Sequence, residues 1–110
     1  MSKFDEAIEA YKADLTDLKV KVDDILLKNI TKGLGPSIYL KDASLVSCSD
    51  QSELDRIKAN FLVGKLGMTD NAEMDQAIKT VCEQYKATHK KRAVFYYLLV
   101  TTLKKETLIS

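Results

Sequence analysis

Apolar residues in the first segment of the chain recur at the spacing of an α-helix. They stand at steps of four, three, four and three residues, at Phe4, Ile8, Tyr11, Leu15 and Leu18. This spacing places them in one stripe along a helix, with the acidic residues off the stripe. We predict a helix over the segment 2–19, with Ser2 as its N-cap. The stripe could dock on a partner helix, but in a chain this short, packing on its own core is favoured.

A second helix is predicted near residues 24–32. Asp23 precedes it and is a suitable N-cap. Val22 and Leu27 can form a hydrophobic staple across the first turn. We expect Gly33 to end this helix, because glycine adopts the left-handed conformation of a helix stop at little cost.

The stretch Gly33–Asp50 predicts an irregular connection, because it contains two Gly, one Pro and four Ser. We expect short helical turns in it, one of them opened by Pro36. Its first residues, GLGPS, lack the GK[ST] of a P-loop and follow a helix instead of a strand. We therefore interpret them as a helix end and a turn, and not as a phosphate site.

Two further helices are predicted, each preceded by an Asp with a Glu three residues later, which is typical of a capping box. The pairs are Asp50 with Glu53 and Asp70 with Glu73. Gly67 is expected to end the third helix. The apolar face of the third helix carries Leu54, Ile57, Phe61 and Leu62. The stripe of the fourth carries Met74, Ile78, Val81, Cys82 and Tyr85.

The last segment, RAVFYYLLV, is apolar on all sides for two turns. It could form a buried strand, but the only partners for it, SIYL and LVS, are too short to build a sheet. We predict a helix over Lys90–Lys105 that is covered on most sides by the other helices. Its centre would be formed by Val94, Phe95, Leu98 and Leu99. Tyr96 and Tyr97 are expected to turn their hydroxyls towards polar partners or the surface.

The fold class predicted from these patterns is all-α, a compact single domain over residues 1–110 with about five helices and the C-terminal helix at its centre. The length of 110 residues and the content of 45% hydrophobic and 30% charged residues fit one globular core. The longest apolar run, Ala93–Val100, is much shorter than the ~20 residues that span a bilayer. Charges throughout the first ten residues argue against a secretion signal, so we expect a cytoplasmic protein without a membrane partner.

Charge divides the chain into two halves. Residues 1–55 carry seven Lys and eleven Asp or Glu, whereas residues 56–110 carry ten basic and five acidic residues. The basic cluster Lys90, Lys91 and Arg92 could contact an anion or an acidic partner. The favoured interpretation is a solvated helix start that lies near the acidic first helix. A sequence pI of about 7.7 makes nucleic acid an unlikely partner.

Cys48 and Cys82 are the only cysteines, and in a reducing cytoplasm we expect both to be free thiols. Cys48 precedes a helix start, where a thiol can become reactive, and a Cys48–His89 catalytic pair is conceivable but unsupported. Cys82 is interpreted as a core residue. The spacing of cysteine and histidine does not match a metal site, and no pattern indicates a catalytic residue or a cofactor.

Four phrases together, TKGLGPSIY, VSCSD, NFLVGKLG and AVFYYLLV, resemble a family of small bacterial proteins known only as a domain of unknown function. The resemblance implies a compact cytoplasmic protein with no established activity, cofactor or partner. We expect a small binding or protein-interaction domain. The alternatives are binding of nucleic acid or an acidic partner through Lys90, Lys91 and Arg92, and a thiol-dependent enzyme or redox sensor that uses Cys48. Self-association is a separate hypothesis, motivated by the opposite charges of the two halves.

Overall fold

The computed structural model describes residues 3–40, 45–69, 71–86 and 90–105. Within these ranges the chain forms five α-helices, which are α1 (Lys3–Asp17), α2 (Asp24–Leu34), α3 (Gln51–Ile57), α4 (Asn71–Gln84) and α5 (Arg92–Thr102). Shorter elements are the 3₁₀ helix η1 (Gly35–Tyr39), the π-helix η2 (Lys58–Val63) and the strands β1 (Leu45–Val46) and β2 (Lys90–Lys91). The predicted all-α single domain is confirmed.

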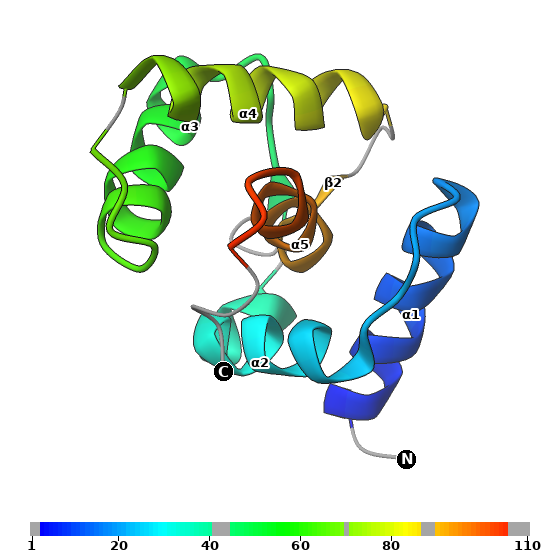
Figure 1. Cartoon of the computed structure of the whole chain (residues 1–110). Helices are drawn as coiled ribbons and strands as arrows, with labels where there is room; N and C mark the ends of the chain where they lie inside the picture. The colour runs from blue at the N-terminus through cyan, green and yellow to red at the C-terminus, as the bar shows by residue number, and fades with distance from the viewer. Residues whose placement is uncertain (1–2, 41–44, 70, 87–89, 106–110) are drawn as a thin grey trace.

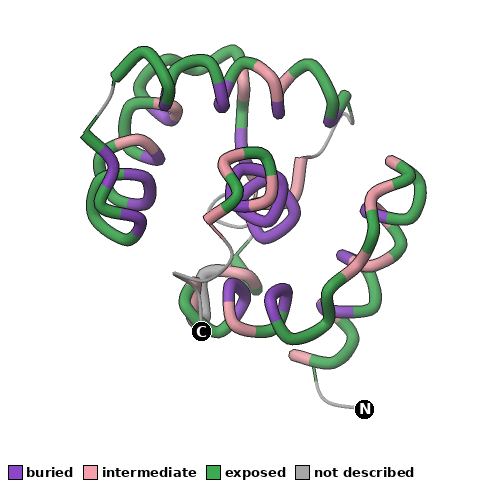
Figure 2. The backbone as a smooth tube through the Cα atoms, viewed as in Figure 1, coloured by how far each residue is buried: buried purple, intermediate pink, exposed green. Residues whose placement is uncertain are grey.

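Helix α5 is the centre of the molecule. In Figure 1 it is seen end-on, with α1, α2, α3 and α4 arranged around it. Each residue from Ala93 to Val100 is at most 8% exposed, and Figure 2 shows the same helix as the most continuously buried part of the chain. The last segment is therefore a helix and not a strand. It satisfies its backbone hydrogen bonds internally while other helices bury its side chains.

Helix α5 begins two residues later than predicted, because Lys90 and Lys91 form a strand. They pair antiparallel with β1, with Leu45 opposite Lys91 and Val46 opposite Lys90. The fragment LVS was too short to predict a sheet, and the ladder that forms has only two residues on each strand. It brings the connection before α3 against the start of α5.

The start of α2 was predicted correctly and its end was not. Asp23 caps the helix by accepting hydrogen bonds from the backbone N–H groups of Ile25 and Leu26, both at 3.1 Å. The helix continues through Gly33, and Gly35 ends it with a φ of 64°. Both positions lack a Cβ, so either could have supplied the left-handed residue, and the sequence alone did not distinguish them.

Asp50 caps α3 as predicted, accepting from the N–H groups of Ser52 and Glu53. The side chain of Glu53 does not complete the capping box, since it bonds to arginines instead. The chain continues from α3 into η2 and reaches its predicted stop at Gly67, whose φ is 66°. Ser2 and Asp70, the caps predicted for α1 and α4, lie outside the described residues.

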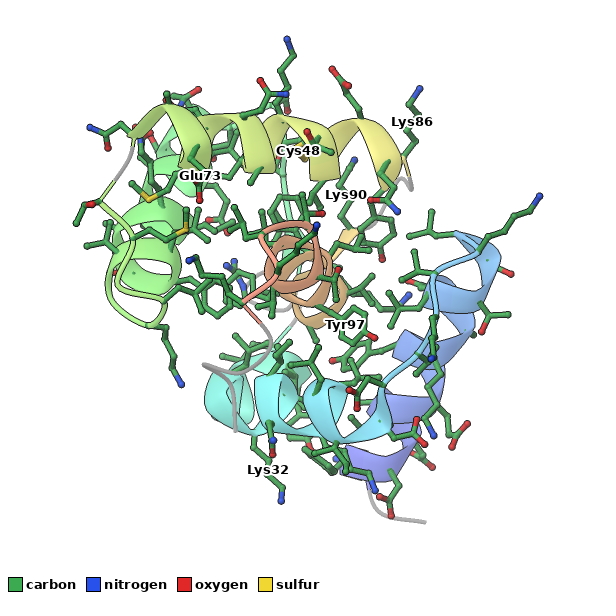
Figure 3. All side chains as sticks on the ribbon, viewed as in Figure 1. Lys32, Cys48, Glu73, Lys86, Lys90 and Tyr97 are labelled. Atoms are coloured by element: carbon green, nitrogen blue, oxygen red, sulfur yellow. A yellow bond between two sulfur atoms is a disulfide. The ribbon has the colours of Figure 1, made fainter. Side chains whose placement is uncertain are left out.

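Tyr97 links α5 to the connection between α1 and α2. Figure 3 shows its side chain pointing from α5 into the space between these two helices. The hydroxyl donates to the carbonyl oxygen of Lys21 and accepts from the N–H of Asp23, both at 2.8 Å. The expectation that the tyrosine hydroxyls find polar partners is confirmed here.

In the described parts of the chain, no helix has the length and apolar character needed to cross a membrane.

Candidate functional site

Cys48 and Cys82 form a disulfide, which corrects the expectation of two free thiols. Cys48 lies in the turn between β1 and α3, and Cys82 lies in the last turn of α4. The two residues are 34 positions apart in sequence, and their Cα atoms are 6.0 Å apart. That distance is typical of a disulfide. The expectation was wrong because it rested on the redox state of a compartment and not on geometry, which only the fold supplies.

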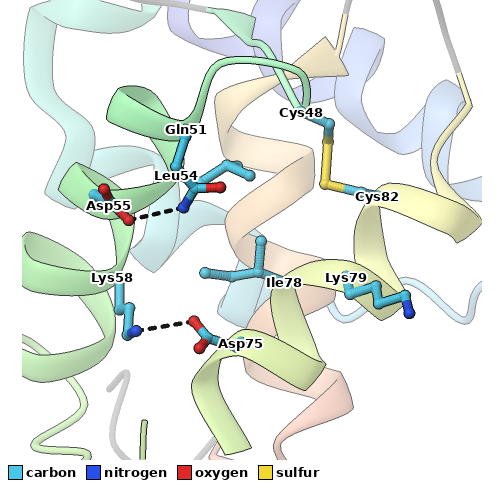
Figure 4. Close-up of a pocket in the computed structure, with 9 residues that line it drawn as sticks. All are labelled: Cys48, Gln51, Leu54, Asp55, Lys58, Asp75, Ile78, Lys79 and Cys82. Atoms are coloured by element: carbon cyan, nitrogen blue, oxygen red, sulfur yellow. Dashed lines mark hydrogen bonds and ion pairs between the residues drawn. A yellow bond between two sulfur atoms is a disulfide. The ribbon is translucent and has the colours of Figure 1, made fainter. Parts of the chain in front are cut away.

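The disulfide forms one end of a groove between α3 and α4. Figure 4 shows the sulfur–sulfur bond at one end, the side chains of Leu54 and Ile78 in the middle, and the pair Lys58–Asp75 at the other end. The groove has a volume of about 350 Å³. Its lining consists of Cys48, Gln51, Leu54, Asp55, Lys58, Asp75, Ile78, Lys79 and Cys82.

Most polar groups of this groove are paired with each other. The ammonium group of Lys58 lies 2.9 Å from the carboxylate of Asp75, and this ion pair links η2 to α4. The amide of Gln51 donates to Asp55 at 2.9 Å, one turn further along α3. Cys48 and Cys82 are only partly buried, so a small thiol or oxidant can approach them from the groove. The redox chemistry of the groove is therefore that of its sulfur pair.

Two cations of the basic cluster point into the protein. Lys91 forms an ion pair with Asp14 of α1, with 2.9 Å between nitrogen and oxygen. The hydroxyl of Tyr85 donates to the same carboxylate at 2.6 Å and accepts from the N–H of Lys91. Burial, followed by the bond to Asp14, raises the pKa of Tyr85 well above its usual value, so this hydroxyl remains a donor. The start of α5 thus lies against the acidic first helix, as the favoured interpretation expected, but Lys91 and Arg92 are partly buried and not solvated.

Arg92 joins α5 to α3 and β1. Its guanidinium donates to the carboxylate of Glu53, to the hydroxyl of Tyr96 and to the carbonyl of Leu45. Burial alone lowers the pKa of Arg92, but its bonds to Tyr96 and Glu53 outweigh burial and raise the pKa. Glu53 is 9% exposed and was predicted to be a capping residue. Glu53 gives the same Asp-x-x-Glu pattern with Asp50 whether its side chain caps the helix or is buried against Arg92. The pattern therefore could not distinguish the two roles.

Comparison with known proteins identifies the family of this chain and gives no activity for it. The sequence model of a family described as a protein of unknown function, DUF2853, matches residues 10–107. The chain belongs to this family. A search of curated proteins finds no match. The resemblance to a domain of unknown function is thereby confirmed, and any function must be argued from the site itself.

The Cys48–His89 pair, which the sequence left unsupported, is not tested here, because His89 lies outside the described residues. In the oxidised state, Cys48 has no thiol that a base could activate. Among the described residues, no three side chains of His, Cys, Asp or Glu lie close enough together to hold a metal ion. Lys90 contributes its backbone to β2, and its side chain is only half-buried.

Proposed function

We propose that this chain is a small cytoplasmic redox sensor, a binding domain whose conformation depends on the oxidation state of Cys48 and Cys82. The observation that carries the proposal is the disulfide at the end of the α3–α4 groove. In a reducing cytoplasm disulfides are rare, and those that form are usually transient, catalytic or redox-sensing. The two carboxylates that line the groove already accept bonds within it, Asp75 from Lys58 and Asp55 from Gln51, which favours a sensor over an enzyme.

Peroxide is an oxidant of the required class. One cysteine, as its thiolate, attacks an oxygen of hydrogen peroxide and becomes a sulfenic acid, while the other oxygen leaves as water after protonation. The second thiol then attacks the sulfenic sulfur, forms the disulfide and releases a second water. The two thiols lose two electrons and one peroxide gains them. A dithiol reductant reverses the reaction by two successive exchanges, and itself becomes the disulfide.

Oxidation changes what holds α4 to the turn before α3. With the disulfide formed, a covalent link fixes the end of α4 beside Cys48. With it reduced, the Lys58–Asp75 ion pair at the other end of the groove is a largely exposed link, since the Asp75 side chain is 65% exposed. Exposed ion pairs contribute little, about 0 to 1 kcal/mol. The groove is therefore the part of the molecule whose width should respond to redox state.

The test is a redox titration of the purified chain in glutathione or dithiothreitol buffers, read by alkylation of free thiols and intact mass. We expect a midpoint above about −300 mV, where cellular thiols can reduce the bond. In the dithiothreitol buffers, Cys48→Ser and Cys82→Ser should each leave one thiol that alkylates at every potential, because oxidised dithiothreitol does not form a stable mixed disulfide. A midpoint far below about −300 mV would make the disulfide structural and reject the sensor.

Partner binding through Lys90, Lys91 and Arg92 is supported less well. Lys91 and Arg92 already form ion pairs within the chain, with Asp14 and Glu53. An acidic partner would have to compete with these carboxylates. Self-association stays a prediction, to be checked by the dependence of molecular mass on concentration.

A further inference from the structure

A second cavity lies between α2 and η2, and it shares no described lining residue with the disulfide groove. Figure 1 shows α2 and the segment α3–η2 on two sides of α5. The cavity has a volume of about 160 Å³. The described residues that line it are Asn29, Ile30, Gly33, Leu34, Asn60, Phe61, Lys65 and Tyr96.

The floor of this cavity is apolar and aromatic. Ile30, Phe61 and Tyr96 are 4–8% exposed, so they present fixed walls and not mobile surface chains. The rings of Phe61 and Tyr96 are stacked, with centroids 4.1 Å apart. Arg92 holds the Tyr96 hydroxyl at 3.2 Å. A cavity of about 150 Å³ lined by apolar side chains accommodates a benzene ring, so this floor has room for one ring-sized apolar group.

The rim of the cavity is formed by polar side chains. Those of Asn29, Asn60 and Lys65 make no hydrogen bond or ion pair with any other residue that the structure describes. The described lining contains one cation and no carboxylate. Gly33 leaves room for the ammonium group of Lys65, which lies 3.0 Å from the position that a Cβ at residue 33 would occupy. A positive charge and two amides thus line the same cavity as the apolar floor.

The π-helix η2 supplies part of the rim and part of the floor of this cavity, since Asn60 and Phe61 belong to it. Such segments are rare and occur frequently at functional sites. Gly64 permits this one, because a Cβ at that position would lie only 2.6 Å from the carbonyl oxygen of Asn60. The sequence NFLVG therefore encodes a backbone that builds this side of the cavity.

We propose that this cavity binds a small monocarboxylic acid with a ring-sized apolar body. The body would rest on Phe61 and Tyr96, and the carboxylate would pair with Lys65 and accept hydrogen bonds from the amides of Asn29 and Asn60. Charge complementarity selects an anion, and the volume selects a single ring. The site is separate from the disulfide groove, so this inference does not rest on the redox proposal.

Benzoate is the probe, with neutral benzamide as its isosteric partner. Titration of the ¹⁵N-labelled oxidised chain, followed by heteronuclear NMR, should give benzoate shifts centred on residues 29–34 and 60–65. Lys65→Gln should weaken benzoate about fivefold, which corresponds to one exposed ion pair, and should leave benzamide unchanged. The matched control is Lys79→Gln, an exposed lysine of the other groove, which should bind benzoate as the parent chain does.

Three results overturn the inference. They are benzoate shifts scattered over many lysines, equal affinity for benzoate and benzamide, and equal effects of the substitutions at Lys65 and Lys79. Each variant's unfolding midpoint is measured first, so that a folding defect is not mistaken for lost affinity. Reducing the chain with dithiothreitol separates the two proposals, because the carboxylate site is expected to keep its affinity when the disulfide opens.

Discussion

The two cavities beside the α3–η2 segment differ in how their polar groups are used. In the disulfide groove, sulfur is bonded to sulfur, Lys58 to Asp75 and Gln51 to Asp55. In the α2–η2 cavity, the rim side chains of Asn29, Asn60 and Lys65 make no such bond to the described residues. Paired groups hold elements together, whereas unpaired groups above an apolar floor are available to a ligand.

Arg92 connects the two cavities. One side of its guanidinium holds the Tyr96 hydroxyl beneath the carboxylate site, and the other bonds to Glu53 of α3 and to the Leu45 carbonyl, three residues before Cys48. A single, largely buried cation therefore positions the floor of one cavity and the chain that leads into the other. Replacing Arg92 should disturb both cavities, so it is the most severe test of the difference between them.

Arg92→Ala should have the largest effect on stability. It leaves the carboxylate of Glu53 poorly exposed and without its buried partner, and removal of one partner from a buried pair typically costs about 3–5 kcal/mol. Urea unfolding followed by circular dichroism measures the loss. Arg56→Ala is the matched control, since Arg56 pairs with the same carboxylate but its side chain is 66% exposed, and this change should cost less than about 1 kcal/mol. Similar losses for both variants would contradict the buried role of Arg92.

Opening the disulfide should have the second largest effect. Closing a loop of 34 residues restricts the unfolded chain, so reduction should lower the free energy of unfolding by about 3–4 kcal/mol. Cys82→Ser should give a similar loss and remove the response to dithiothreitol. At the other end of the groove, Asp75→Asn should change stability by less than about 1 kcal/mol. If reduction has no effect on the unfolding midpoint, the disulfide does not hold α4 in place.

The periodic parts of this fold were predictable, and the reason is physical. Local patterns each determine one element of the fold. These patterns are the apolar stripes of α1 and α4, the caps Asp23 and Asp50, and the apolar side chains on all sides of α5. The end of α2 was misplaced, because Gly33 and Gly35 offer the same backbone freedom two residues apart. The choice between them depends on how α2 packs, and not on the local sequence.

The candidate sites were far less predictable, because they depend on contacts between distant segments. Cys48 and Cys82 are 34 positions apart in sequence and are brought together only by the fold, and the expected compartment argued against such a bond. The cavity at Asn29 and Lys65 joins residues of α2, η2, α5 and the turn after η2, and no sequence spacing links them. The η2 segment has a helical pattern, and nothing in its apolar spacing distinguishes a π turn from an α turn.

Gly64→Ala should disturb the α2–η2 cavity and leave the disulfide groove largely intact. The new Cβ would lie 2.6 Å from the carbonyl of Asn60, so the backbone of η2 has to move. Overpacking of this kind typically costs about 1–3 kcal/mol. Thermal unfolding measures the loss, and NMR titration should show weaker benzoate binding. Unchanged stability and binding would mean that the chain does not need the π turn.

Gly33→Ala should give the smallest change in stability, with the opposite sign. Gly33 lies inside α2 with ordinary helical backbone, where alanine is favoured over glycine by about 0.5–1 kcal/mol. The added Cβ would come within 3.0 Å of the Lys65 ammonium group, the end of a flexible side chain that can move aside. We therefore expect a slightly higher unfolding midpoint together with weaker benzoate binding. A variant that is more stable and binds benzoate as before would show that Lys65 needs no space at Gly33. A less stable variant would show that the backbone of α2 requires glycine at position 33.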